Sequence, residues 1–439
     1  MVNNRLEKYS IFSQGFRGLP DGWHNLRSFN FLVGENSTGK SSFLQLIEII
    51  DSQQHLFFLE LLGVAPGIDS VFDVCTRSGN SSEITIGFLL RKRERKAKRK
   101  SALPDSRVFG RLITYKKVKD NLRIISVTIA VDNAVYIFRR IGGSISFKKI
   151  DWEYDTESRH IENARRFSEI HSSPQLRLKA THASDIDSSF SWLTAIGAQT
   201  SREAGDSRFS LVLASPPLNC LQYGPLRGKT RRLYYGIKSE FSSTGEHFAF
   251  MVKNAMSNRP ELMSSIEDFG KASGLFDKLS VVSMATKVKD KPFAFQLEKA
   301  GSFYYVDELG FGVGQILPIV ADLAISSSEV SFLVQQPELH LHPRAQAALG
   351  DVFLRAVSGG RMLVVETHSD FIIDRFRVRH KQMGEDAPSA QIVYFEKDPV
   401  SGKNVAHEIN LLSDGGMSNV PDSYRGFFME EKLDLFENL

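Results

Sequence analysis

The sequence predicts an α/β fold whose core is built from two distant parts of the chain. Near the N-terminus, residues 28–50 show a strand, a glycine-rich loop and a helix in succession. Near the C-terminus, residues 331–343 and 361–373 each show a short apolar strand that ends in polar residues. A long segment without comparable motifs separates the two parts. The 439 residues, 42% of them hydrophobic, allow two or three domains or one domain with a large insertion.

The phosphate-binding loop is the strongest local signal. Residues 34–41 follow a predicted strand at 28–33 and precede a predicted amphipathic helix from Ser42, the context that supports the motif G-x-x-x-x-G-K-[ST]. Glycines let the backbone turn its amide groups toward phosphate oxygens, and the helix adds its positive end. We expect Lys40 to reach the β and γ phosphates of ATP and Ser41 to bind Mg²⁺. The predicted nucleotide-binding residues of the loop are Gly34, Asn36, Ser37, Thr38, Gly39, Lys40, Ser41 and Ser42.

Three further motifs lie close together near the C-terminus. The segment ELGFGVGQILPIVADL at 308–323 places glycines before a predicted apolar helix. The segment FLVQQPELHLHPRAQ at 332–346 contains a strand end, and RMLVVETHSDFII at 361–373 contains another, followed by His368. The order is therefore phosphate loop, long insertion, glycine-rich helix, polar strand end and histidine.

This order resembles the ATP-binding-cassette (ABC) class of ATPase heads, as in the SMC, RecF and OLD families. The segments PELHLHP, GFGVGQILPI and ETHSDFII resemble the OLD-like ATPases of bacterial antiphage defence, most closely the AriA family of PARIS systems and second the PtuA family of Septu systems. The resemblance covers roughly residues 1–150 and 295–400. It implies an ABC-type P-loop head made of residues 1–150 and 296–439, with a compact helical subdomain for dimerisation inserted at 151–295.

The resemblance also implies roles for single residues. Gly312 and Gly314 would belong to a signature helix that caps the γ-phosphate bound to a neighbouring chain, so the ATP sites would be shared within a homo-oligomer. Position 314, here glycine, is often serine in these families. His368 would sense the γ-phosphate. Arg17 would approach the phosphates or the base, although a surface arginine on a loop explains it equally well.

The strand end at Gln335 departs from the family pattern, which places an acid there. Glutamine carries no charge, so it cannot accept a proton from water at neutral pH, and Mg²⁺ prefers carboxylate oxygens. We retain Gln335 as the expected catalytic and metal position, beside Ser41. Three interpretations stay open: a natural, slowly hydrolysing switch, an engineered change that traps ATP, or a catalytic role for Glu338.

Residues 91–100, RKRERKAKRK, contain eight Lys or Arg residues on a predicted hairpin loop. Such a run gains affinity for phosphates by releasing counterions, so nucleic acid is a candidate partner. An acidic protein or no partner at all fits the run as well.

The sequence shows no signal peptide, no run of 18 apolar residues for a membrane and only two cysteines, which together favour a reducing, cytoplasmic location.

The segment after His368 is too short for the Toprim nuclease of the OLD enzymes. If the resemblance holds, we expect a separate Toprim-like or HNH nuclease as effector.

These observations predict an ATP-binding and ATP-hydrolysing sensor-scaffold subunit. It would control a partner nuclease through ATP-dependent self-assembly, with a phage protein as a possible trigger. One alternative is a RecF- or SMC-like repair or recombination ATPase that binds DNA directly. The other is a scaffold that binds ATP and never hydrolyses it.

Overall fold

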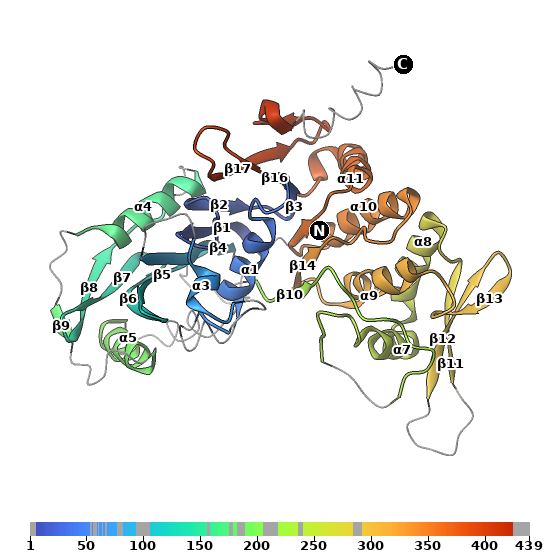
Figure 1. Cartoon of the computed structure of the whole chain (residues 1–439), viewed down its shortest axis with the longest axis horizontal. Helices are drawn as coiled ribbons and strands as arrows, with labels where there is room; N and C mark the ends of the chain where they lie inside the picture. Colours follow the sequence, from blue (N-terminus) through green and yellow to red (C-terminus); the bar gives the residue numbers. More distant parts are fainter. Residues whose placement is uncertain are drawn as a thin grey trace, which may run out of the picture.

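Three β-sheets and the helices packed on them make up the molecule (Figure 1). The computed structural model describes residues 6–52, 55, 59, 61–63, 65, 68–76, 82–93, 106–155, 159–174, 179–181, 189–204, 218–235, 240–283 and 292–424. In these ranges no helix is long and apolar enough to cross a membrane.

The central sheet has seven strands in the order β10-β14-β15-β3-β16-β17-β18, of which the first five are parallel. Its strands come from distant parts of the chain: β3 (Phe29–Gly34), β10 (Cys220–Tyr223), β14 (Ser331–Gln335), β15 (Leu363–Glu366), β16 (Ala390–Lys397), β17 (Asn404–Leu411) and β18 (Met417–Ser418). The predicted strands at 28–33, 331–334 and 361–367 are therefore neighbours. Both halves of the sequence build this one sheet.

The second sheet is antiparallel and has eight strands in the order β2-β1-β4-β5-β6-β7-β8-β9. The strands are β1 (Leu6–Gln14), β2 (Gly22–Leu26), β4 (Glu83–Arg93), β5 (Ser106–Val118), β6 (Asn121–Val131), β7 (Ala134–Ile141), β8 (Ser144–Asp151) and β9 (Lys179–Thr181). The expected hairpin exists, because β4 pairs with β5 from Glu83–Lys116 to Arg93–Ser106. Residues 94–100 of the basic run lie outside the described part.

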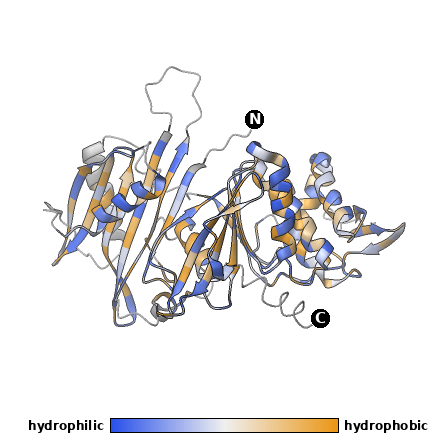
Figure 2. Cartoon of the chain, turned by 90° about the horizontal axis from the view of Figure 1, so that it is seen from above, coloured by the Kyte–Doolittle hydropathy of each residue, from blue (hydrophilic) through white to orange (hydrophobic). Residues whose placement is uncertain are grey.

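Helix α1 (Lys40–Asp51) lies between the two large sheets. Its apolar side chains share one core with residues of both sheets. Side chains alternate along each central strand. In β3, Leu32 packs toward α1, whereas Phe31 and Val33 point to the opposite face. Because both faces of the central sheet are covered, β3, β14 and β15 are mostly apolar and buried along their length. Figure 2 shows hydrophobic stretches on the strands and helices that pack together. This packing fixes the start of α1, and with it the phosphate loop, against the end of β3.

The opposite face of the central sheet is covered by helices that share the other core. They are α7 (Phe248–Asn258), α8 (Met263–Ser273), α9 (Phe311–Ile325), α10 (Pro343–Ser358) and α11 (Asp370–Met383). The described residues also include short 3₁₀ turns at Pro260–Leu262 and Gly384–Asp386 and the short helix α3 (Val71–Val74). The glycine-rich helix predicted at 308–323 is α9.

The segment expected to be a compact helical insertion, 151–295, is distributed over the molecule. Helices α4 (His160–Ser172) and α5 (Ser189–Ala204) and strand β9 accompany the antiparallel sheet, while β10 is an edge strand of the central sheet. Strands β11 (Lys278–Ser283), β12 (Phe293–Lys299) and β13 (Ser302–Tyr305) form the third sheet. Both expected boundaries fall inside strands, 150/151 in β8 and 295/296 in β12. Because these strands are hydrogen-bonded on both sides of each boundary, the segment is not a separable helical body.

Candidate nucleotide-binding site

The phosphate loop and the ends of β14 and β15 meet at the carboxyl edge of the parallel strands. β15 pairs directly with β3, and β14 pairs with β15, so Leu32, Glu366 and Gln335 lie side by side. In open parallel sheets, ligands bind at this edge. The fold therefore brings the residues predicted near the N-terminus and near the C-terminus into one site.

The loop conformation explains its glycines. Gly34 and Gly39 have φ of 140° and 113°, which L side chains rarely adopt. A Cβ on Gly34 would also overlap the carbonyl oxygen of Phe395 on β16. Ser37 has a positive φ of 65°, and Thr38 donates its hydroxyl to the Glu35 carbonyl at 2.8 Å. Asn36 and Ser37 are exposed at the tip of the loop.

Lys40 lies inside the curve of the loop. Its Nζ donates to the carbonyls of Gly34 at 2.9 Å and Glu35 at 2.5 Å, and the residue is only 4% exposed. Burial lowers the pKa of Lys40, while the charges of Glu366 and Glu35 oppose that shift. The ammonium is therefore held at the place where the loop would surround phosphates.

Glu366, at the end of β15, is a candidate site residue that sequence reasoning missed. The Ser41 hydroxyl donates to its two carboxylate oxygens at 3.2 and 3.1 Å, and Glu366 is 5% exposed. Burial raises the pKa of Glu366, the bonds from Ser41 and the charge of Lys40 lower it, and the charge of Glu338 raises it. A signal was present in RMLVVE, an acid that closes an apolar strand.

The Gln335 side chain sits one strand farther from the loop. Its neighbour Gln336 has a positive φ of 42°, and its N–H donates to the Glu366 carbonyl at 2.8 Å. The chain thus turns sharply after β14. Gln335 carries no charge. The carboxylate that contacts Ser41 of the phosphate loop therefore comes from Glu366 at the end of β15, not from β14.

Glu338 and His368 approach each other at the same edge. The His368 N–H donates to Glu338 Oε1 at 2.7 Å, while Glu338 Oε2 is buried without a hydrogen-bond partner. Burial raises the pKa of Glu338, and bonds including that from His368 oppose the shift. The pKa of His368 is lowered by partial burial and then by the charge of Lys40, so its imidazole lies within electrostatic reach of the loop.

Arg227, in the segment between β10 and α7, ties this edge to helix α9. Its guanidinium donates to the carbonyls of Gln335 and Gln336, both at 3.2 Å. Its backbone exchanges two hydrogen bonds of 3.0 Å with the side chain of Gln315. Burial lowers the pKa of Arg227 to about 10, opposed by the charge of Glu338. The arginine therefore holds the end of β14 and helix α9 in one arrangement.

The glycines of α9 are explained by packing within the chain. A Cβ on Gly312 would overlap the His340 carbonyl, and a Cβ on Gly314 would lie 2.9 Å from Thr230 Cγ2. Thr230 therefore leaves no room for the serine that often stands at this position. The helix begins at Phe311, which is 49% exposed, and no side chain caps its first amides.

Arg17 lies beside the start of α1. Its carbonyl accepts a long bond of 3.5 Å from the Ser42 hydroxyl, and its N–H donates to Val74 at 2.9 Å. The pKa of Asp73 is lowered mainly by hydrogen bonds from Ser70 and to a smaller degree by the charge of Arg17. The arginine is thus near the loop and within electrostatic reach of Asp73.

The donor set fits Mg²⁺ bound together with a nucleotide. Mg²⁺ is usually held by one or two carboxylates, substrate phosphates and water. Ser41 and Glu366 provide a hydroxyl and a carboxylate next to the loop. In the described ranges, no group of three or more His, Cys, Asp or Glu side chains could hold a metal alone. A bound cation here would accordingly depend on the phosphates.

Comparison with known proteins agrees with this geometry. The family model described as "AAA ATPase domain" (AAA_15) matches residues 10–373. No curated protein matches the chain. Similar solved structures include an Smc head bound to the C-winged helix domain of ScpA, at 12% identity, TM-score 0.44 and coverage of 92% of this chain and 97% of that one.

Two further solved structures are similar to the chain. One is an Smc head with an extended coiled coil bound to the C-terminal domain of ScpA, derived from Pyrococcus furiosus. It has 11% identity, a TM-score of 0.43 and coverage of 99% and 98%. The other is an SMC head from Thermotoga maritima, with 10% identity, a TM-score of 0.38 and coverage of 92% and 98%.

The fold and the site define a P-loop ATPase domain, which confirms the predicted α/β class of P-loop ATPase. The family match covers most of the chain, and the chain belongs to the AAA_15 family of ATPase domains.

Proposed function

We propose that this ATPase head binds and hydrolyses ATP in composite sites formed between chains, and that its nucleotide state controls a separate nuclease in antiphage defence. The observation that carries the ATPase part is the convergence of Lys40, Ser41, Glu366 and His368 at one sheet edge. The defence role, with a Toprim-like or HNH nuclease as effector and a phage protein as trigger, rests on the resemblance of PELHLHP and ETHSDFII to the PARIS and Septu ATPases.

Each residue has a role in this proposal. Lys40 and the loop amides bind the β and γ phosphates, and Ser41 and Glu366 hold Mg²⁺, which would neutralise phosphate charge when bound. Gln335 orients ligands through its amide without accepting a proton. Glu338, whose pKa is raised by burial, accepts a proton from the attacking water, and His368 contacts the γ-phosphate.

The composite site would use the exposed start of α9. Helix N-termini bind anions through their free amides and dipole. Gly310 has open space around its Cα, and Phe311 is half exposed, so a phosphate on a neighbouring chain can approach there. Gly312 and Gly314 have no side chains, so α9 can pack closely against its own chain. In this position no side chain of these two residues blocks the phosphate of the neighbouring chain.

The experiment is ATP turnover by this chain beside Gln335→Glu, with Lys40→Ala as the blank. Turnover above the blank in the unaltered chain supports hydrolysis assisted by Glu366 and Glu338. Turnover only in Gln335→Glu identifies position 335 as the missing acid and this chain as a trapped or slow form. If both proteins stay at the blank level while ATP still binds, the hydrolytic proposal fails and ATP is a structural ligand.

The second candidate is a RecF- or SMC-like ATPase that binds DNA directly, which the basic run at 91–100 favours. It predicts ATP-dependent DNA binding without a partner nuclease. A Toprim-like or HNH nuclease encoded beside this gene would favour the defence role instead.

A further inference from the structure

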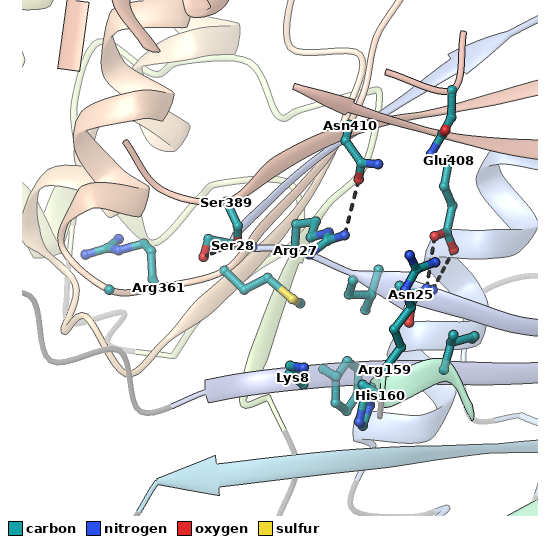
Figure 3. A pocket seen from close by; sticks show the side chains of 16 residues that line it. Lys8, Asn25, Arg27, Ser28, Arg159, His160, Arg361, Ser389, Glu408 and Asn410 are labelled. Carbon is teal, nitrogen blue, oxygen red and sulfur yellow. Dashed lines mark hydrogen bonds between the residues drawn. The ribbon is translucent and has the colours of Figure 1, made fainter. Parts of the chain in front are cut away.

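A polar groove of about 770 Å³ lies at the amino edge of the parallel strands (Figure 3). Ser28 and Ser389 line it directly before β3 and β16, and residues 360–362 line it before β15. Since the phosphate loop follows β3, the groove and the nucleotide site lie at opposite edges of the same sheet. The groove is therefore a separate candidate binding site.

The groove carries more positive than negative charge. Lys8 from β1, Arg27 after β2 and Arg159 before α4 line it, and all three are exposed. Among the described residues, the lining contains one acid, Glu408, whose carboxylate accepts from the backbone and side-chain nitrogens of Asn25 at 2.7 and 3.0 Å. Three exposed cations thus face one carboxylate that already has hydrogen-bond partners.

Arg361 also lines the groove but does not add to this charge. Its guanidinium points away from the other labelled side chains (Figure 3), donates to the Ser326 carbonyl at 2.9 Å and lies over the Phe332 ring. The charge of the groove therefore depends on Lys8, Arg27 and Arg159.

Positive charge continues beyond the groove along the β1–β4 pair. Lys8 is paired with Arg91, and Leu6 is paired with Lys92, so the basic run begins at this end of the sheet. His160 in the groove wall is 6% exposed, and its pKa is lowered to about 4 by burial and further by the charges of Lys8 and Arg91, against a bond with Leu89. The neutral imidazole thus lies within an electropositive region.

The uncharged lining also favours a phosphate-rich ligand. Side-chain groups of Asn25, Ser28, Ser389 and Asn410 stand beside the cations, and Arg27 donates to Asn410 at 3.2 Å. Arginine, lysine, serine and asparagine are the side chains that contact nucleic-acid phosphates. Cations spread over a groove of this size match several phosphates rather than one small anion.

Other ligand classes fit the lining less well. Protein partners depend on accessible aromatic or apolar anchors. Tyr9, Leu26 and Met362 line the groove but are only 3%, 6% and 4% exposed, and Ile161, which also lines it, is half-buried. Single-stranded nucleic acid is held by stacking of its bases on aromatic rings, and Tyr9 is buried. The groove thus offers charge and hydrogen bonds without an apolar anchor.

We propose that this groove binds double-stranded nucleic acid through its phosphates, without reading its sequence. Lys8, Arg27 and Arg159 each neutralise a phosphate, and the asparagine and serine side chains orient the backbone. This site is independent of the proposed ATPase mechanism, because none of its residues touches the phosphate loop.

The test is binding of a fluorescent DNA duplex to the full chain without nucleotide, measured by anisotropy over a series of salt concentrations. The groove variant is Lys8→Gln/Arg27→Gln/Arg159→Gln. The control variant, Lys271→Gln/Lys278→Gln/Lys299→Gln, removes equal charge from exposed lysines of α8, β11 and β12. Thermal unfolding of both variants checks the fold, and Arg27→Lys/Arg159→Lys keeps the charge if the triple groove variant is unstable.

We expect the groove variant to bind the duplex at least about tenfold more weakly and its log–log salt slope to fall by about 2 to 3. The control variant and the lysine double variant should keep most of the affinity. Equal losses in the groove and control variants, or no loss in the groove variant, overturn the proposal. Polyglutamate that competes as strongly as unlabelled duplex also overturns it, in favour of an acidic protein partner.

Discussion

Strands β14 and β15 are neighbours whose last residues, Gln335 and Glu366, form one register pair, and only Glu366 carries a carboxylate. The difference has a geometric reason. β15 pairs with β3, the strand that leads into the phosphate loop, whereas β14 is one strand farther away, about 4.8 Å. An acid at the end of β15 can therefore contact Ser41 directly. The comparison teaches that the residue type at position 335 does not decide by itself whether the site has a carboxylate.

The largest effect is expected from Glu366→Gln. The change removes the carboxylate next to Ser41, so the affinity of the ATP complex for Mg²⁺ should fall by at least about 10- to 100-fold, and turnover should fall with it. Titration of nucleotide binding with Mg²⁺ measures the first effect independently of hydrolysis. Glu385→Gln, an exposed acid in the turn after α11, is the matched control. Unchanged Mg²⁺ dependence in Glu366→Gln would remove Glu366 from the metal site.

The double variant Gln335→Glu/Glu366→Gln moves the acid by one strand. If distance from Ser41 matters, this variant should recover only part of the Mg²⁺ affinity lost in Glu366→Gln. The same Mg²⁺ titration, run on both proteins in parallel, gives the answer. Full recovery of Mg²⁺ affinity would mean that an acid at the end of either strand can bind the metal. The difference between β14 and β15 would then have no effect on function.

Arg227→Met tests how the end of β14 is held. The change leaves the Gln335 and Gln336 carbonyls without their donor and Glu338 without a nearby cation, so the free energy of unfolding should fall by about 3 kcal/mol. Chemical denaturation measures it. Arg259→Met, at an exposed ion pair with Glu261, should change the same quantity by less than about 0.5 kcal/mol. Equal values for the two variants would show that Arg227 does not brace the strand end.

Gly314→Ser should be destabilising by about 1 to 3 kcal/mol because its Cβ would meet Thr230. Thr230→Ala removes the opposing atoms, so the double variant should be less destabilised than the sum of the single variants. A double-mutant cycle from denaturation curves measures this coupling. If the changes in the free energy of unfolding are strictly additive, contact with Thr230 does not explain the glycine at position 314. The explanation would then lie in the ATP site of the neighbouring chain.

The smallest effect concerns pH. Burial raises the pKa of Glu338 and of Glu366, so the folded chain without ligand binds protons more tightly than the unfolded chain. The resulting stability is fully present below the ordinary carboxyl pKa and is lost as pH rises through the raised values. Thermal midpoints across this window should fall less steeply in Glu366→Gln than in the unaltered chain. Parallel curves would contradict the raised pKa of Glu366.

The sequence allowed the prediction of features that depend on local pattern. The phosphate loop, the strands at 28–33 and 331–334 and the helix at α9 follow from residue spacing, and the structure has them. Glu366 was missed because its importance depends on which strand lies beside β3, a property of the folded sheet. Arg227 was missed for a similar reason, since its partners are backbone carbonyls more than a hundred residues away.

The segment 151–295 shows more clearly what the periodicity of the sequence cannot predict. Helices α4, α7 and α8 lie in this segment, and a local periodic pattern gives no information on the sheets these helices accompany. Strand β10 is only four residues long, and its place at the edge of the central sheet comes from parallel pairing with β14. Such pairing is specified by contacts distant in sequence, which a local pattern cannot show.

Strand β3 is six residues long. At about 3.3 Å per residue, it spans roughly 20 Å between the groove at its start and the phosphate loop at its end. A strand that is hydrogen-bonded on both sides is stiff, so a displacement of one end is passed to the other end. If both sites are occupied, thermodynamic linkage requires that any change which duplex binding causes in ATP affinity equals the change which ATP causes in duplex affinity. One pair of titrations would therefore measure the coupling free energy between the two edges of this sheet.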